Sequence, residues 1–534
     1  MSAAVHLPKE RLYVIATFLV LAFLALYGFT AKVQILEGEL NAARSDDRVN
    51  RTVEMPAYRG RILDRHGKAL AVSRPVHPLY VKVGKAQAWS EEEWQSLAQS
   101  LSSNVVVLKE TLAGADKNGM VAIKRDATPE MADAITRKRK EIMADRRRKN
   151  KEYWQGLVVD KAYKRFYMEG EVMAPLLGVV NGEGVGVEGL ELAQESWLAG
   201  SDGARNVKVV PGGSVVEEEG VSLAARNGGD VQLSIDSYIQ NIAYRELKAA
   251  VQTHKARAGS MVVLDAVNGE VLAMANYPSF DPNAISKVDR EHMRNRAIMD
   301  VFEPGSTIKP FTIGMALDTK KTTLEQVQAT GSPYVVGSFT VKDAHPHADL
   351  TTAQVLQKSS NIGTARIAED ISKELMWRTL NDVGFGLSPN VGFPHERAGR
   401  LRLPSTWARS DKVTLSYGYG LSVNLLQLAR SYTVFTNSGA LLTASLLKTD
   451  LMRGGGSPIF TAKTAQDLSL VLEKAATKDG TAPLAQTDGY RVAGKTGTAK
   501  KNQKGQYQAG KYVSSFVGFA PVSSPRLIVA VMID

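Results

Sequence analysis

The residues with the clearest chemical potential are Ser306 and Lys309, which lie three positions apart in the stretch E-P-G-S-T-I-K-P-F. If Pro304 and Gly305 form a turn and a helix starts near Ser306, both side chains lie on one face of that helix. A serine hydroxyl needs a neighbouring base, and an amine can serve when burial or nearby cations keep it neutral. We therefore predict that Ser306 is a nucleophile and Lys309 its general base. The free N–H groups of the helix start could stabilise an oxyanion.

An S-x-x-K match is weak on its own, because ordinary serine and lysine usage gives about two such matches by chance in a chain of this length. Ser445 to Lys448 is interpreted as a chance match. The first match gains weight from two downstream motifs, Ser359-Ser360-Asn361 and Lys495-Thr496-Gly497-Thr498. Penicillin-binding proteins and class A β-lactamases combine S-x-x-K with S-D-N and K-T-G, and the middle motif here has the form S-x-N.

With these motifs the chain resembles the class B penicillin-binding proteins, and most closely their division-specific peptidoglycan D,D-transpeptidases. The resemblance runs from an N-terminal apolar segment to the K-T-G motif. It also includes four longer stretches: R-G-R-I at 59–62 with Asp64-Arg65, D-V-F-E-P-G-S-T around Ser306, Y-G-Y-G-L-S-V-N at 417–424, and T-A-K-K after Gly497.

The resemblance implies a serine acyl-enzyme that cross-links peptidoglycan stem peptides during septal wall synthesis, without a cofactor. The expected partners are a D-Ala-D-Ala donor peptide, an amine acceptor, and β-lactams as covalent inhibitors. Other division proteins, including a membrane glycosyltransferase, are implied as protein partners. The resemblance also places the N-terminus in the cytoplasm and the catalytic domain in the periplasm, anchored in the inner membrane.

The K-T-G motif supplies groups that suit a substrate with a terminal carboxylate. Lys495 offers a cation for that carboxylate. Thr496 and Thr498 offer hydroxyl groups beside it, and Gly497 lets the strand backbone approach the substrate. We therefore predict that these four residues bind substrate.

Two further roles follow from the resemblance. The backbone N–H groups of Ser306 and Thr498 are expected to form the oxyanion hole. Ser359 is expected to relay a proton to the leaving amine, and Asn361 can present its side-chain amide to the substrate backbone. The alternative interpretation of Ser359 and Asn361 is a helix cap.

Competing functions differ in where the acyl group goes. A carboxypeptidase or β-lactamase transfers it to water, and class A hydrolases recruit a glutamate for this step. An elongation-specific transpeptidase, a β-lactam sensor and a non-enzymatic division scaffold are further alternatives. The apolar anchor and the large region before the motifs favour a wall synthase, and intact Ser306, Lys309 and Lys495 argue against a scaffold.

The composition is that of a globular protein of several domains, with 534 residues and a formal net charge of +11. The absence of cysteine excludes disulfides, a cysteine nucleophile and thiolate metal sites. Much of the positive charge lies in residues 137–151. This run lacks interleaved aromatic residues, so a solvated helix face is favoured over nucleic-acid binding.

Residues 12–31 carry no charge and are long enough to cross a bilayer core of about 30 Å. They predict a transmembrane helix after a cytoplasmic tail at residues 1–11. A cleavable signal peptide fits poorly, because Phe29-Thr30-Ala31 does not match an A-x-A-like site. Lysine and arginine flank the span on both sides, so the positive-inside rule does not fix the orientation.

Residues 32–51 predict a juxtamembrane stalk, with Val33, Leu36 and Leu40 at helical spacing. The resemblance implies a pedestal and dimerisation domain over residues 52–225. In this region we predict strands at 79–83 and 157–160, and helices at 91–101 and 129–147.

Two patterns suggest ligands but have simpler interpretations. Residues 184–189 match G-x-G-x-x-G, yet a dinucleotide site also needs a compact βαβ unit with an acidic residue about 20 positions on, and Asp202 comes too early. The glycines are interpreted as tight turns. His345-Pro-His347-Ala-Asp349 has metal-ligand residue types, but Pro346 favours a solvated turn, and no metal site is predicted.

Residues 230–534 are predicted to form the transpeptidase domain, of class α+β. A strand at 231–235, a helix at 237–254 and a hairpin of 259–265 with 270–276 open it, and strands at 490–495, 511–520 and 527–533 close it. We expect an antiparallel sheet and a helical part with the active site between them.

The chain stops directly after the apolar run 527–533. The resembling family continues from this strand into a turn, a further segment and a C-terminal helix. We therefore predict a C-terminally truncated form in which this strand lacks a partner and a sheet face lacks its helix.

Overall fold

The computed structural model describes residues 9–36, 50–146, 153–209, 215–285, 288–449, 455–503 and 506–534. The chain divides into two units. The first unit contains residues 1–58 and 200–227, and the second contains residues 59–199 and 228–534. Most of the predicted cytoplasmic tail and of the predicted stalk, including Leu40, lies outside the described residues.

The first unit begins with α1 (Lys9–Ala31), followed by a short π-helix, η1 (Lys32–Leu36). Residues 10–35 form one helix that is long and apolar enough to cross a membrane, with a mean hydropathy of 2.3 over its best window. Its side chains from residue 10 to residue 30 are exposed. An exposed apolar surface of this length suits lipid better than water. The predicted N-terminal apolar helix is therefore confirmed.

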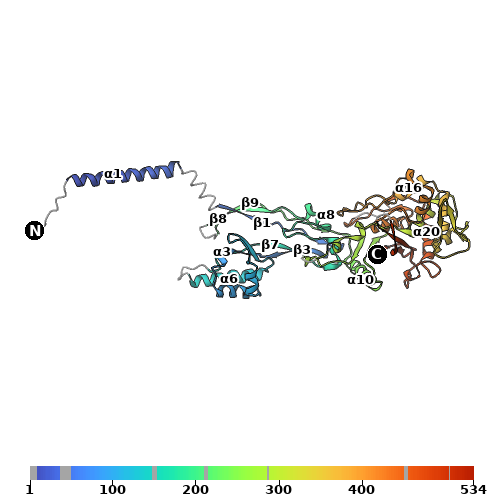
Figure 1. Ribbon diagram of the computed structural model, residues 1–534, viewed down its shortest axis with the longest axis horizontal. Coiled ribbons are helices and arrows are strands. Elements are labelled where there is room, and N and C mark those ends of the chain that lie inside the picture. Colours follow the sequence, from blue (N-terminus) through green and yellow to red (C-terminus); the bar gives the residue numbers. More distant parts are fainter. Residues whose placement is uncertain are drawn as a thin grey trace. The chain divides into compact units, whose positions relative to one another are not determined.

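The first unit also contains a three-stranded antiparallel sheet with the order β1-β8-β9 (Figure 1). Its strands are β1 (Asn50–Met55), β8 (Gly203–Val209) and β9 (Val215–Leu223). The register pairs Met55 with Gly203. Two side chains extend the pairing beyond β1: Asp202 accepts a hydrogen bond from Ala57 N, and Asn227 accepts one from Tyr58 N.

The second unit opens with a mixed sheet of order β10-β2-β3-β7. Its strands are β2 (Ile62–Leu63), β3 (Ala69–Val76), β7 (Ala162–Tyr167) and β10 (Val231–Gln232). The R-G-R-I stretch at residues 59–62 leads into β2 of this sheet. Buried Arg59 and Arg165 both form ion pairs with buried Glu191, at 2.7 and 2.6 Å. Such a buried network holds three chain segments in one arrangement because each charge needs its partner.

A smaller lobe of the second unit has the sheet order β5-β4-β6. It contains β4 (Leu79–Lys82), α3 (Val83–Ala86), α4 (Glu91–Ser100), α5 (Val105–Glu110), β5 (Met120–Lys124), α6 (Pro129–Arg146) and β6 (Leu157–Val159). The two predicted strands and two predicted helices agree with β4, β6, α4 and α6 to within one residue at each end. The lobe has its own core around Trp94 and Trp154, and the Trp154 indole donates to Glu93 O at 2.8 Å.

The G-x-G-x-x-G stretch follows helix α7 (Ala174–Leu177), not a strand, and short helices α8 (Gly189–Ala193) and α9 (Glu195–Leu198) come after it. Asn181 closes the turn by accepting hydrogen bonds from Glu183 N and Val185 N, both at 3.0 Å. A Cβ at Gly186 would lie 2.2 Å from Glu191 O. The glycines therefore serve tight turns and close backbone packing in this fold.

The C-terminal half of the second unit is built on a five-stranded antiparallel sheet with the order β12-β11-β21-β20-β19. The strands are β11 (Gly259–Asp265), β12 (Val271–Tyr277), β19 (Ala493–Gln503), β20 (Gln506–Ala520) and β21 (Leu527–Ile533). Helix α10 (Ser237–Thr253), capped by Asp236, packs Tyr244 and Leu247 against one face. The predicted helix, hairpin and closing strands are present, but β19 begins at Ala493 and not at 490, and of the predicted strand 231–235 only Val231–Gln232 (β10) forms.

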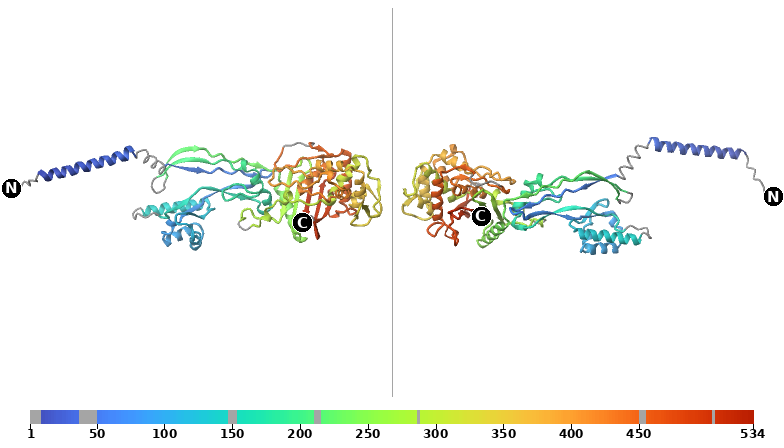
Figure 2. Two further views of the ribbon diagram at one scale, coloured as in Figure 1. Left: turned by 45° about the horizontal axis from the view of Figure 1, so that its top comes forward. Right: turned by 180° about the vertical axis from the view of Figure 1, so that it is seen from behind.

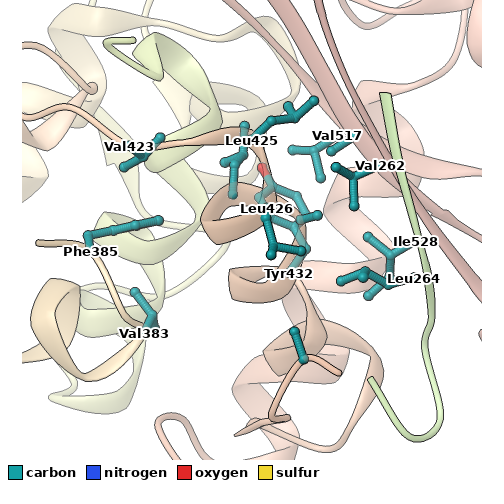
Figure 3. Close-up of a cluster of buried hydrophobic side chains, with 14 of the residues drawn as sticks. Val262, Leu264, Val383, Phe385, Val423, Leu425, Leu426, Tyr432, Val517 and Ile528 are labelled. Carbon is teal, nitrogen blue, oxygen red and sulfur yellow. The ribbon is translucent and has the colours of Figure 1, made fainter. Parts of the chain in front are cut away.

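The other face of the sheet packs on a helical part, which Figure 2 shows from two further sides as yellow and orange segments beside the red strands. Strand residues alternate between the faces. Val262 and Leu264 of β11 and Ile528 of β21 face Leu425 and Leu426 of α18 (Leu425–Ser431) in Figure 3. The predicted α+β class is confirmed.

The remaining helices of this half are α11 (Arg290–Met293), α12 (Arg296–Met299), α13 (Lys309–Asp318), α14 (Thr352–Lys358), α15 (Asn361–Glu369), α16 (Lys373–Asp382), α17 (Arg409–Ser416), α19 (Thr433–Thr436) and α20 (Ala462–Ala475). Two-stranded pairs join β13 (Val327–Gln328) to β16 (Leu350–Thr351), β14 (Tyr334–Val336) to β15 (Phe339–Val341), and β17 (Ala440–Leu441) to β18 (Ser457–Pro458). Short 3₁₀ turns occur at η3 (Gly170–Val172), η5 (Gly305–Ile308), η6 (Pro404–Thr406) and η7 (Pro483–Ala485).

The prediction that strand 527–533 lacks a partner is wrong. β21 lies in the interior of the sheet, paired along its whole length with β11 on one edge and β20 on the other. Its alternate residues contribute to both faces: Ile528 and Ala530 to the helical core, and Val529 and Val531 to the α10 side. Linear proximity to the end of the chain misled the prediction, because sheet order does not follow sequence order.

Candidate active site

The stretch around Ser306 forms a 3₁₀ turn, η5, that leads directly into α13. Gly305 opens the turn with a φ of +56°, a backbone conformation that favours glycine. Residues i and i+3 eclipse one another in a 3₁₀ turn. Ser306 and Lys309 therefore lie on one face, as predicted, although the α-helix itself begins at Lys309 and not near Ser306. Ser306 is partly exposed, whereas Lys309 is fully buried.

The Lys309 amine reaches the S-x-N motif. Its Nζ donates to Ser359 O at 2.5 Å and lies 3.2 Å from Ser359 Oγ. Burial lowers the pKa of Lys309 well below its usual value, and the charge of nearby Lys495 adds to this, while Asp343 opposes it. An amine with a lowered pKa is neutral at a pH where an exposed lysine is charged, so Lys309 can accept a proton.

The S-x-N motif joins two helices. Ser359 ends α14 in the left-handed region, with φ +63°, and this places its hydroxyl beside Lys309. Ser360 caps α15 by accepting from Gly363 N at 2.9 Å. The helix cap, which was the alternative interpretation of Ser359 and Asn361, is thus made by Ser360. Asn361, at the first position of α15, donates from its side chain to Lys342 O at 3.1 Å.

Asp343 is a site residue that the sequence analysis missed. Its carboxylate accepts hydrogen bonds from Ser360 Oγ at 2.6 Å, Asn361 N at 2.6 Å and Ile362 N at 2.9 Å. A carboxylate is stabilised at a helix N-terminus, and here it also fixes the S-x-N turn. Only the fold brings it there, because it lies 18 residues before Asn361 in the chain.

Lys495 is the second buried amine of the site. Its Nζ lies 3.2 Å from Thr496 O and 3.5 Å from Thr481 Oγ1, and Thr496 Oγ1 donates to Thr481 Oγ1 at 2.9 Å. Burial lowers the pKa of Lys495 to about 7. The amine therefore carries a partial charge near neutral pH, and a bound carboxylate would favour its charged form. Thr481, like Asp343, comes from a segment without a motif.

Gly497 lets β19 pack tightly against the nucleophile turn. A Cβ at this position would lie 2.5 Å from Pro304 O and 3.0 Å from Thr307 Cγ2. On the same side, a Cβ at Gly305 would lie 3.1 Å from Thr498 O. The space where a side chain of Gly497 would lie is thus occupied by the protein's own chain. These glycines bring Ser306 beside the K-T-G strand.

Thr498 lies on β19, the edge strand of the sheet, and its side chain is exposed. The Tyr419 hydroxyl donates to Thr498 O at 3.4 Å, so this carbonyl points away from β20. In a β-strand the N–H and C=O of one residue point to the same side, and an edge strand leaves them unpaired. The Thr498 N–H therefore faces the turn that carries Ser306, and Thr498 N lies 3.4 Å from a Cβ built at Gly305.

The Y-G-Y-G stretch at residues 417–420 also contacts η5 and the residues just before it. Gly305 N donates to Gly418 O at 3.1 Å, and a Cβ at Gly418, where φ is +92°, would lie 1.9 Å from Gly305 O. Gly420 N donates to Glu303 Oε1 at 2.9 Å. These contacts hold the turn that carries Ser306 in place.

The second S-x-x-K match and the H-P-H-A-D stretch do not join the residues of the candidate site. Ser445 Oγ donates to Leu447 O at 2.7 Å within a local turn. Asp349 of the H-P-H-A-D stretch accepts hydrogen bonds from Thr330 N and Gly331 N, both at 3.0 Å. Within the described part of the chain, no group of three or more His, Cys, Asp or Glu side chains is arranged to hold a metal ion.

The fold and this site define a serine acyltransferase with two buried lysines. Comparison with known families agrees: residues 259–534 match the penicillin binding protein transpeptidase domain, and residues 54–233 match the penicillin-binding protein dimerisation domain. The chain belongs to the penicillin-binding proteins and has the class B architecture of dimerisation and transpeptidase domains.

Named relatives agree with this assignment. The chain is 39% identical over 494 residues to the probable peptidoglycan D,D-transpeptidase PenA of Neisseria gonorrhoeae, covering 92% of this chain and 82% of the relative. It is 34% identical over 521 residues to the peptidoglycan D,D-transpeptidase FtsI of Escherichia coli K12, covering 97% and 86%. Penicillin-binding protein 3 of Mycobacterium tuberculosis, solved in complex with aztreonam, superimposes with a TM-score of 0.68 at 26% identity, covering 90% and 91%.

Proposed function

We propose that this protein is a peptidoglycan D,D-transpeptidase that cross-links stem peptides through an acyl-enzyme on Ser306, during septal wall synthesis. The observation that carries the proposal is the pairing of a partly exposed serine with a fully buried lysine one 3₁₀ turn away. The names of the relatives PenA and FtsI support the substrate class, and the name FtsI supports the septal role.

In the acylation step, Ser306 Oγ attacks the carbonyl carbon of the penultimate D-Ala, and Lys309 Nζ takes the hydroxyl proton. The backbone N–H groups of Ser306 and Thr498 stabilise the oxyanion that forms. When the intermediate collapses, the C–N bond breaks and the terminal D-Ala leaves as an amine. Ser359, whose hydroxyl lies 3.2 Å from the Lys309 amine, passes the proton to the leaving D-Ala amine. Lys495, Thr496 and Asn361 hold the terminal carboxylate and the peptide backbone.

In the second step, the amine of a neighbouring stem peptide attacks the ester, its proton passes back through Lys309, and Ser306 is released. A carboxypeptidase would use water here. The Lys309 amine is the base in both steps. The choice of acceptor therefore depends on which nucleophile can reach the ester.

The proposal is tested by supplying a D-Ala-D-Ala donor peptide with and without an excess of an amine acceptor peptide. We expect a cross-linked dimer that grows with acceptor concentration, together with release of D-Ala. Release of D-Ala without dimer at any acceptor concentration would assign the protein to the carboxypeptidases. Penicillin labelling without either product would instead favour a β-lactam sensor.

The membrane anchor is proposed to have its N-terminus in the cytoplasm and its catalytic half in the periplasm, because the substrate is outside the inner membrane. The observation behind it is the exposed apolar helix of residues 10–35. Protease added to intact spheroplasts is expected to degrade the region beyond Lys32. Survival of that region until the membrane is lysed would reverse the orientation. Division proteins, including a membrane glycosyltransferase, are the proposed neighbours in that membrane.

A further inference from the structure

The residue that follows the S-x-x-K pair affects how its turn is hydrogen-bonded. In an α-helix, Ser306 O would accept from the N–H four residues on, but that residue is Pro310, which has no N–H. Ser306 O accepts from Lys309 N instead. This is the i to i+3 bond of a 3₁₀ turn, the geometry that places Ser306 and Lys309 on one face. The proline therefore withholds the first α-type bond from this turn.

The carbonyl of the next residue, Thr307, is held by a side chain from a distant segment. Thr307 is fully buried, and its Oγ1 donates to Pro304 O at 2.9 Å. In an α-helix its carbonyl would accept from Phe311 N, yet α13 begins only at Lys309. The Thr307 carbonyl accepts a hydrogen bond from the Tyr432 hydroxyl at 2.9 Å. Tyr432 therefore competes for the carbonyl that the second α-type bond would use.

The Tyr432 side chain is a fixed donor. It is fully buried between α18 and α19, and Figure 3 shows it beside Leu426. Its ring makes edge contacts with Phe311 and Phe435, with centroids 5.8 and 5.2 Å away. Burial raises the pKa of Tyr432 well above the ordinary tyrosine value of 10.0. The phenol therefore remains a donor throughout the pH range in which the Lys309 amine titrates.

We propose that Tyr432 is a positioning residue for acylation: its hydroxyl holds the Thr307 carbonyl and so keeps Ser306 in the 3₁₀ turn beside Lys309. The inference rests on the proposed function of Ser306. Tyr432 acts through the backbone of the turn, because its side chain is fully buried and bonds to that backbone. Such support affects the rate, since a displacement of about 1 Å at a reacting group can cost a factor of about 100.

The test is Tyr432→Phe, which removes the hydroxyl and keeps the ring in its packing. Acylation is followed over a range of penicillin concentrations, which separates the dissociation constant of the first complex from the rate constant of acylation. We expect the rate constant to fall roughly tenfold to a hundredfold. The dissociation constant should stay within about twofold of wild type, since the groups assigned to substrate binding lie on β19 and α15, not on the segment of Tyr432.

The matched control is Tyr167→Phe. Tyr167 is also a buried tyrosine, and its hydroxyl accepts from Val180 N at 3.1 Å, in the mixed sheet of the second unit. Both variants should lower the melting temperature, because each leaves a buried backbone group without its partner. Only Tyr432→Phe should slow acylation. A rate constant for Tyr432→Phe within about twofold of wild type, or an equal fall in Tyr167→Phe, would overturn the inference.

Pro310→Ala provides a second test, because the alanine N–H makes the first α-type bond possible. Since Pro310 and Tyr432 oppose the same change of the turn, the double variant should lose more than the product of the two single losses. A double variant no slower than Pro310→Ala would overturn the inference. If one variant melts early, all proteins are compared below the onset of its melting. Absence of a penicillin label on Ser306 in the wild-type protein would instead reject the proposed function.

Discussion

Ser306→Ala is expected to abolish covalent labelling by a fluorescent penicillin and to lower acyl transfer from a stem peptide by a factor of roughly 10⁴ to 10⁶, the cost of removing a serine nucleophile. The reason is geometric: the 3₁₀ turn carries the partly exposed Ser306 three residues before the fully buried Lys309. The measurement is the labelling rate of the purified protein, with the site of label identified by mass spectrometry.

The chain provides a matched control in its second S-x-x-K match. Ser445→Ala changes a serine whose hydroxyl donates to Leu447 O in a local turn, and it should be labelled at the wild-type rate. The melting temperature of Ser306→Ala should stay close to that of the wild-type protein, because the hydroxyl is partly exposed. Residual labelling of Ser306→Ala at Ser359 or Ser445 would remove Ser306 from its assigned role.

The sequence predicted the site's motifs because each motif is local. Ser306 with Lys309 is one turn, Ser359 to Asn361 is one helix junction, and the K-T-G residues are one strand segment. Each has a chemical meaning that can be recognised without the fold. The same holds for the apolar helix at residues 10–35 and for most elements of the sheet, whose hydrophobic periodicity is local.

The sequence could not predict what long-range packing supplies. Asp343 and Thr481 carry no motif, and they reach the site only because β15 packs beside α15 and α20 packs beside β19. The close packing at Gly497 could not be predicted for the same reason, since Pro304 O, its near neighbour, comes from a distant part of the chain. The last strand was expected at a bare edge, yet β21 pairs on both sides. In each case the missing information was which segments become neighbours.

Lys309→Ala is expected to slow acylation by roughly 10² to 10⁴, the usual contribution of a general base, while Ser306 remains in place. The pH dependence separates this role from a structural one. In the wild-type protein the acylation rate should rise with pH as the Lys309 amine loses its proton. Because burial and Lys495 lower the pKa of Lys309, this rise should be complete well below the ordinary lysine value of 10.5. In Lys309→Ala the rise should be absent.

The same shift affects stability, and its sign follows from proton binding. Between the lowered folded-state pKa of Lys309 and the unfolded value of 10.5, the unfolded chain binds more protons than the folded one, so stability rises with pH in that window. Lys309→Met, which keeps the length of the side chain without its charge, should lose this part of the slope. Lys321→Ala, at an exposed lysine after α13, should keep both the slope and the acylation profile. An acylation rate for Lys309→Ala within about fivefold of wild type, with the pH-dependent rise intact, would assign the proton transfer to another group, and Ser359, whose hydroxyl lies 3.2 Å from the amine, would be the next candidate.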